Sequence, residues 1–241
     1  MKESAIGKMT NYAALGSFEA FRSVVVEGVR PEWLSSTKFG HEFDLSLRMI
    51  FNMARRETER YLPSPQYILE PFKYLSPPDV RVIITAQDPY PRSQDAMGIA
   101  FHSLSDYCPY SAKAINANLV KYGHIAEESA DSADYRPWLR QGVLLTNVSL
   151  TTKEGKSGEH AAPWKGVVRE ALLMAPKKAV ALMLGRDAKS IISTLSTVYK
   201  IEHAHPASRG GEFETRDIFG EVNADLVRLG YAPINWTPGR A

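Results

Sequence analysis

The amino-acid sequence predicts an α/β fold, a single domain with a central, mainly parallel four-stranded sheet flanked by helices. Four short apolar runs, each followed by polar or turn-forming residues, are spaced along the chain with helical patterns between them. Strands that alternate with helices favour βαβ units and therefore a parallel sheet. The 241 residues, 44% of them apolar, are enough for one substantial core, and we find no internal repeat or linker.

The four predicted strands are apolar and have turn signals on both sides. A continuous apolar run of this kind is typical of a strand that is buried on both faces. The predicted strands cover residues 80–86, 142–147, 179–184 and 199–204, and the last of these is the weakest. The predicted helices that separate and follow them cover residues 111–122, 164–174, 187–198 and 217–229.

The N-terminal part of the chain has a less regular pattern. Residues 1–30 are predicted to form an N-terminal extension, with an accessory helix over residues 17–26. Residues 31–241 are predicted to form the main domain. Its first long helix is expected over residues 43–61, where apolar side chains recur at helical spacing, and Pro63 ends it.

Composition and charge exclude several classes of protein. Cys108 is the only cysteine, so an intramolecular disulfide and a cysteine-rich zinc site are both excluded. No apolar run approaches the roughly 18 residues that would span a membrane, so we expect an intracellular protein with no membrane partner. A net charge of +2 is too small for a general DNA-binding surface, so a nucleic-acid partner would need a local groove.

Several common catalytic motifs are also missing from the sequence. No GxxxxGK[ST] or GxGxxG loop follows a strand, which argues against an α/β nucleotide-binding protein, and no GxSxG elbow is present. No spacing of His, Asp and Glu stands out as a set of metal ligands. We therefore expect no metal and no cofactor.

Polar side chains follow the predicted strands at the point where each strand ends. Gln87 and Asp88 follow the first strand, Asn147 ends the second, and His205 follows the fourth. In open α/β sheets this edge is where ligands bind. Each residue alone has a more ordinary role, as a turn former, a backbone hydrogen bonder or a surface side chain. Their convergence on one edge from distant segments indicates a site.

A carboxylate, an amide, an imidazole and nearby aromatic rings suit a planar heterocycle. An aromatic ring can stack on its face, and an amide can read an edge that carries both a donor and an acceptor. An imidazole can stabilise an anion that develops on the ring. The residue types therefore indicate recognition of a base-like ligand.

Several segments, taken in order, resemble family 1 uracil-DNA glycosylases. The similarity runs from about Trp33 to Trp236, and Gln87-Asp88-Pro89-Tyr90 is similar to the family's water-activating motif. Five later segments of this chain also resemble segments of the family, in the same order. They are Gly98-Ile99-Ala100-Phe101, residues 142–147, His160 with Trp164, Leu184-Gly185 and His205-Pro206-Ala207-Ser208. The resemblance implies that residues 31–241 are a uracil-DNA glycosylase-like catalytic domain.

The resemblance also implies a role for individual residues. Asp88 would position the attacking water and stabilise the cationic sugar, and His205 would donate to O2 of the departing uracil. Uracil would be flipped out of the duplex, at a cost of a few kcal/mol. The implied uracil-binding residues are Gln87, Tyr90, Phe101 and Asn147, and the implied DNA-binding residues are Ser111, Pro206, Ser208 and Arg209.

The uracil-binding residues would each read a different feature of the base. Phe101 would stack on its face, and Asn147 would bond N3–H and O4, an edge on which cytosine exchanges donor and acceptor. Tyr90 would stand beside C5, where the methyl group of thymine would clash. Gln87 would contribute backbone contacts.

The sequence also departs from the usual pattern of the family. Ala86 stands where the family has Gly, Pro91 where it has His, and Arg209 where it has the Leu that fills the gap left by the flipped base. Pro91 and Arg209 resemble the poxvirus branch, whose glycosylase is also a polymerase processivity subunit. Three other cations, Lys153, Lys156 and Arg186, are weaker candidates for phosphate contacts.

The predicted function is therefore that of a monofunctional uracil-DNA glycosylase, an N-glycosyl hydrolase of base excision repair. The alternative is a DNA-binding replication or processivity subunit that retains the glycosylase fold. The expected partners are uracil-containing DNA and, beyond it, replication proteins or a proteinaceous inhibitor. We expect a monomer in the cytoplasm or nucleoid of a bacterium or in a virus-infected cell, with a nuclear location left open.

Overall fold

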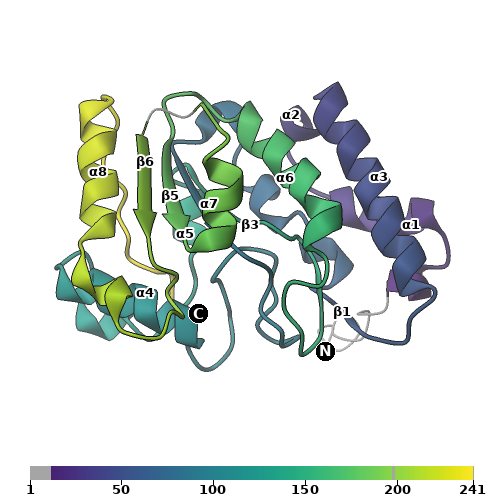
Figure 1. Cartoon of the computed structure of the whole chain (residues 1–241), viewed down its shortest axis with the longest axis horizontal. Coiled ribbons are helices and arrows are strands. Elements are labelled where there is room, and N and C mark those ends of the chain that lie inside the picture. The colour runs from purple at the N-terminus through teal and green to yellow at the C-terminus, as the bar shows by residue number, and fades with distance from the viewer. Residues whose placement is uncertain (1–11, 197–198, 241) are drawn as a thin grey trace.

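A four-stranded parallel sheet lies at the centre of the molecule (Figure 1). The computed structural model describes residues 12–196 and 199–240. The strands lie in the spatial order β3-β2-β5-β6, and the predicted α/β fold class is confirmed. Their bounds are Val82–Ala86 for β2, Val143–Asn147 for β3, Val180–Leu184 for β5 and Tyr199–His203 for β6.

The burial of the strands explains their sequence patterns. Every residue of β2, β3 and β5 is buried, which is why these strands are continuous apolar runs. In β6, at the edge of the sheet, only the central residue is buried, which accounts for its weaker signal. Strand β2 begins two residues later than predicted, because Val80 still caps the short helix Pro77–Asp79.

Helices surround the sheet on both sides and at its edges. In Figure 1, α6 and α7 lie in front of the sheet, α3 runs beside α6, and α8 lies beside β6. Among the described residues, no helix is both long enough and apolar enough to cross a membrane. The helices are α1 (Phe18–Val26), α2 (Pro31–Leu34), α3 (Thr37–Ala54), α4 (Tyr110–Lys121), α5 (Arg136–Leu139), α6 (Ala161–Met174), α7 (Arg186–Ile192) and α8 (Ile218–Arg228).

The helix predicted over residues 43–61 is wrong at both ends. It begins at Thr37, because the Ser36 hydroxyl accepts a hydrogen bond from the third residue of the helix and caps it. It ends at Ala54, and a two-residue strand, β1 (Tyr61–Leu62), follows. This strand pairs antiparallel with β4 (Thr152–Lys153), a small sheet that the sequence did not predict.

The helix predicted over residues 187–198 is also too long. It ends at Ile192, and the Thr194 hydroxyl donates to the Ile191 carbonyl in place of a further helical turn. The Lys200 ammonium donates to the carbonyls of Ser193 and Leu195. The last two predicted residues, 197–198, lie outside the described part of the chain.

Residues 12–30 share the hydrophobic core with the rest of the chain. Phe21 of α1 stacks on Phe51 of α3 at 5.4 Å between ring centroids. The Tyr12 hydroxyl donates to the Pro63 carbonyl at 2.7 Å. Although the boundary at residue 30 stays a prediction, this segment packs as an integral part of the fold.

Candidate active site

A cavity of about 310 Å³ opens at the carboxyl ends of the parallel strands. Its lining comes from the loops that follow β2, β4 and β6, from the end of β3 and from the start of α4, at the lower side of the sheet in Figure 1. The predicted site residues that line it are Gln87, Asp88, Tyr90, Phe101, Ser111, Asn147 and His205. The structure therefore brings together residues from four distant segments.

Asn147, the last residue of β3, is only 1% exposed. Its Oδ1 has no hydrogen-bond partner among the described residues. The Val148 N–H donates to the Ala86 carbonyl at 2.8 Å, which ties the loops after β3 and β2 together. A buried acceptor without a partner costs free energy, so this residue of the cavity wall has an acceptor to offer to a donor that enters the cavity.

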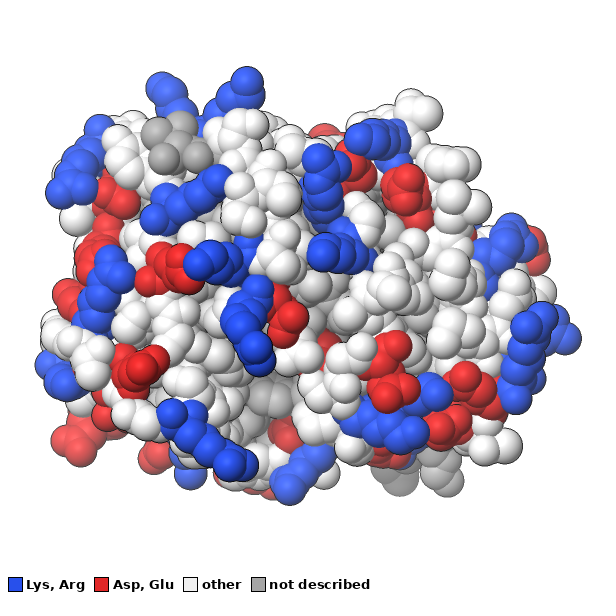
Figure 2. Space-filling view, in the orientation of Figure 1, with Lys and Arg blue, Asp and Glu red and all other residues white. Residues whose placement is uncertain are grey.

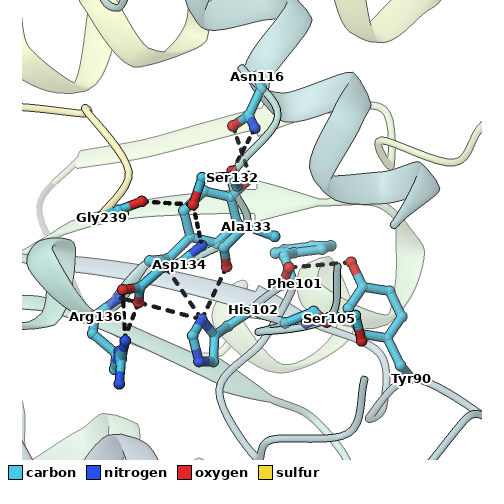
Figure 3. Close-up of polar contacts among 12 residues, drawn as sticks. Tyr90, Phe101, His102, Ser105, Asn116, Ser132, Ala133, Asp134, Arg136 and Gly239 are labelled. Carbon is cyan, nitrogen blue, oxygen red and sulfur yellow. Dashed lines mark hydrogen bonds and ion pairs between the residues drawn. The ribbon is translucent and has the colours of Figure 1, made fainter. Parts of the chain in front are cut away.

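Phe101 is held in an uncommon backbone conformation next to Tyr90. Its φ angle is +61°, although it is not a glycine, and its side chain is 6% exposed. The Tyr90 hydroxyl donates to the Phe101 carbonyl at 3.1 Å (Figure 3). Burial raises the pKa of Tyr90, so the phenol keeps this proton at neutral pH. The two rings are thus fixed before any ligand binds.

A buried polar network supports the segment that carries Phe101 (Figure 3). The His102 Nδ1 lies 2.9 Å from the Ala133 carbonyl and 3.2 Å from the Tyr135 N–H. Burial lowers the pKa of His102 to about 4, so the ring is neutral at pH 7. Beside it, Arg136 donates to both carboxylate oxygens of Asp134, each at 2.7 Å.

The Asp88 carboxylate is held by the loop between β4 and α6. The Ser157 hydroxyl donates to its Oδ1 at 3.0 Å, and the Gly158 N–H donates to its Oδ2 at 2.6 Å. Burial raises the pKa of Asp88, and these two hydrogen bonds oppose that rise. Because a carboxylate has about four acceptor sites, it can still hold a water molecule.

Sequence reasoning missed Ser157 and Gly158. Each is about 70 positions from Asp88 in the chain, and a polar turn carries no chemical signature of its own. The same loop is anchored by Lys153, whose ammonium lies 2.8 Å from Glu57, and by Lys156 near Glu59. Two of the weaker phosphate candidates are therefore paired with carboxylates.

His205 follows β6 and faces Gly185 at the end of β5. A Cβ on Gly185, whose φ is +88°, would lie 3.0 Å from the His205 Cβ, so glycine permits this approach. The Ala207 N–H donates to the His205 Nδ1 at 3.0 Å. Burial lowers the pKa of His205, while Asp187 opposes that shift. A neutral ring whose Nδ1 accepts must carry its proton on Nε2.

Of the predicted DNA-binding residues, Ser111 lines the cavity, and Pro206, Ser208 and Arg209 lie outside its lining. Pro206 is buried, and the Ser208 N–H donates to the His205 carbonyl at 2.8 Å. Arg209 is exposed, and Ser111 lies in the first turn of α4. The His205 loop thus combines a half-buried imidazole with an exposed cation.

Comparison with known families decides the classification of this site. The family model described as the Uracil DNA glycosylase superfamily matches residues 72–227. The chain belongs to this superfamily. A uracil-DNA glycosylase of Streptomyces coelicolor is 33% identical over 183 residues, covering 73% of this chain and 80% of the relative. One of Mycobacteroides abscessus is 35% identical over 185 residues, with the same coverage.

Solved structures of other uracil-DNA glycosylases share the fold. The mimivirus uracil-DNA glycosylase has a TM-score of 0.78 at 24% identity and covers 91% of this chain and 92% of its own. A variant of the mimivirus protein has been solved in complex with UGI, with a TM-score of 0.77. The protein of Nitratifractor salsuginis has a TM-score of 0.59 at 22% identity, covering 93% of this chain and 98% of its own.

Proposed function

We propose that this chain is a uracil-DNA glycosylase that hydrolyses the N-glycosidic bond of flipped-out deoxyuridine. The products are free uracil and an abasic site in the DNA. The observation that carries the proposal is the unpartnered Oδ1 of Asn147 in the same cavity as Asp88 and His205. Membership of the superfamily and the relatives' names support it.

Uracil recognition in this proposal uses the buried wall of the cavity. The Asn147 Oδ1 accepts from N3–H of uracil, and its amide NH₂ donates to O4. Cytosine would present a lone pair where Asn147 needs a donor, so it is rejected. Phe101 stacks on the base, and Tyr90 occupies the space that the methyl group of thymine would need. The Gln87 backbone adds contacts to the base.

The chemical step uses the two titratable groups of the site. Asp88 orients a water molecule toward C1′ of the sugar. The C1′–N1 bond breaks, and its electron pair leaves with uracil as an anion. The Nε2–H of His205 donates to O2 of that anion, because Nδ1 is already bonded to the Ala207 N–H. The Asp88 charge stabilises the cationic sugar until the water oxygen bonds to C1′, and Asp88 then accepts the proton that this water loses.

DNA binding in this proposal is local to the cavity rim. Figure 2 shows Lys and Arg interspersed with Asp and Glu over the displayed face, in keeping with the net charge of +2. Ser111 in the first turn of α4, Pro206 and Ser208 contact the DNA backbone beside the flipped nucleotide. Arg209 fills the vacated space in the duplex or binds phosphate.

Uracil release is the direct test of the proposed function. We expect the purified protein to release uracil from a uracil-containing oligonucleotide in the presence of a chelator, and Asp88→Asn to lose most of this activity. The exposed residue Asp106 provides a matched control, since Asp106→Asn should release uracil at the wild-type rate. Equal inactivity of the wild type and Asp88→Asn would falsify the proposal.

The alternative is that the protein acts as a processivity subunit, a role that needs the fold but not catalysis. The exposed cation Arg209, in place of the family's Leu, is the feature that favours it. A processivity assay with Asp88→Asn separates the two roles, because a scaffold would retain its function. Replication proteins, a proteinaceous inhibitor, a monomeric state and an intracellular location stay predictions.

A further inference from the structure

A second groove of about 280 Å³ adjoins the candidate active site. Four residues line this groove but not the cavity of the active site: Arg92, Tyr107, Pro109 and Tyr110. It is continuous with the cavity described above, because both are lined by Tyr90, Pro91, Asp95, Ser111 and Ala207. If one unit of a polymeric ligand enters the cavity, the next unit of that polymer therefore lies beside this groove.

Two tyrosines at the groove are unusually exposed. The Tyr110 side chain, at the first position of α4, is 71% exposed, and Tyr107 is 38% exposed. Tyr110 is the most exposed of the large hydrophobic side chains among the described residues. A ring left in water beside a binding cavity, at the start of a rigid helix, is a surface on which a flat ligand can stack.

The position of Tyr107 is fixed by a buried carboxylate. Asp95 is 3% exposed and accepts hydrogen bonds from the hydroxyls of Tyr107, Ser103 (2.9 Å) and Ser105 (2.6 Å). The guanidinium of Arg92 lies 3.5 Å from the Tyr107 hydroxyl. Because this side chain is ordered in advance, little further entropy is lost when a ligand binds against it.

We propose that this groove holds the base of the nucleotide adjacent to the flipped deoxyuridine, unpaired and stacked on the Tyr110 ring. Tyr107 forms the side of the groove, and Arg92 supplies positive charge for the neighbouring phosphate. This inference rests on the proposed function. One phosphodiester joins the two nucleotides, and the continuity of cavity and groove matches that connection. Aromatic stacking accepts any base, since every base has a π face.

The groove therefore selects the form of the substrate. In a duplex, the adjacent base is paired and would have to leave its partner to reach Tyr110. In a single strand that base is free, so stacking adds to substrate binding at no cost in pairing. The expected consequence is that removal of the Tyr110 ring lowers uracil release from a single strand more than release from a duplex.

The test compares uracil release from two single strands that both contain deoxyuridine. In the second strand, the nucleotides on both sides of deoxyuridine are replaced by abasic spacers. For the wild type we expect kcat/KM to be about 5- to 150-fold lower on the spacer strand, the range for loss of one stacked base. Tyr110→Ala should release uracil from both strands at the lower value, and Tyr110→Phe should behave like the wild type.

Two controls separate this proposal from the proposed function. Tyr122→Ala removes a tyrosine from the far end of α4 and should leave the spacer effect intact. Equilibrium binding of the same strands to Asp88→Asn, with and without Tyr110→Ala, repeats the comparison without catalysis. An active wild type with an equal spacer effect in Tyr110→Ala would overturn the groove proposal and leave the glycosylase proposal standing. An inactive wild type would overturn the glycosylase proposal, and the binding comparison would still decide the groove proposal.

Discussion

The two walls of the candidate active site are built in different ways. In the inner wall, Phe101 and Asn147 are each at least 94% buried, and their segments are joined by hydrogen bonds to β3 and β2. The outer wall consists of His205 and Ala207, at the start of a loop that continues beyond the cavity to the exposed side chain of Arg209. Backbone donors from Ala207 and Ser208 hold the His205 side chain and carbonyl.

This difference separates two tasks. A base is read through hydrogen bonds that must be placed within a few tenths of an ångström, so its readers belong on rigid strand ends. DNA is gripped mainly through charge and surface contacts, which tolerate an exposed loop. We therefore expect changes to the inner wall to alter which base is accepted, and changes at the end of the outer loop to alter how firmly DNA is held.

The largest effect should follow from Asn147→Leu, which removes the polar edge at similar side-chain size. We expect kcat/KM for uracil release to fall about 10²- to 10⁴-fold, because the N3–H and O4 groups of the base would be buried without partners. Steady-state release from a uracil-containing oligonucleotide measures this loss.

The neighbouring residue Thr146 is a matched control for Asn147→Leu. It lies on the same strand, and its buried hydroxyl also lacks a hydrogen-bond partner among the described residues. Thr146→Val should retain activity and stability, because it removes an unsatisfied polar group without changing the shape of the side chain much. If Asn147→Leu were as active as Thr146→Val, the inner wall would not read the base.

A second large effect concerns stability at acidic pH. Burial lowers the pKa of His102 and of His160 from 6.5 to about 4. Between about pH 6.5 and pH 4, the unfolded chain binds more protons than the folded one. The free energy of unfolding should therefore decrease as the pH falls through this range. Each histidine contributes a slope of up to about 1.4 kcal/mol per pH unit. Urea unfolding at a series of pH values measures it.

Variants at these histidines identify the source of the slope. His102 supports the segment of Phe101, and the His160 Nδ1 lies 3.0 Å from the Thr151 hydroxyl. His102→Asn or His160→Gln should flatten the pH dependence, whereas a change at the exposed His41 should not. An unchanged slope in both buried variants would contradict the assignment.

The sequence predicted the polar residues at the strand ends better than the loop and the small sheet around them, for a physical reason. Asn147 and Asp88 could be placed because parallel strands bring their carboxyl ends to one edge, whatever the loops do. The bonds from Ser157 and Gly158 to Asp88 depend on how a loop folds back, and no periodicity encodes that. The paired strands β1 and β4 were missed for the same reason, since two residues are too few for an alternating pattern.

An intermediate effect is expected for Ser157→Ala, which removes one donor to Asp88. Loss of that hydrogen bond should raise the pKa of Asp88 further, so the acidic limb of the kcat profile should move to higher pH. We expect kcat to fall about tenfold with little change in KM, since one charge-assisted hydrogen bond is lost. Ser157→Thr should restore both values, because it returns the hydroxyl.

A purely structural role for Ser157 predicts a different result. In that case the loop would loosen, KM would rise with the fall in kcat, and the pH profile would keep its position. Ser190→Ala, on the exposed side of α7, is the matched control and should leave both constants unchanged. The position of the acidic limb therefore distinguishes positioning of the carboxylate from support of the loop.

The smallest effect should come from Arg209→Ala at the exposed end of the outer loop. If Arg209 pairs with phosphate, the dependence of log K on log salt should decrease by about 0.9 for a duplex, with affinity lowered only severalfold. If its side chain fills the space left by the flipped base, duplex binding should weaken while the salt slope stays unchanged. DNA binding titrations over a range of salt concentrations separate these outcomes. Wild-type values of both quantities would remove Arg209 from the DNA interface and would leave the substrate contacts of this loop to His205, Pro206 and Ser208.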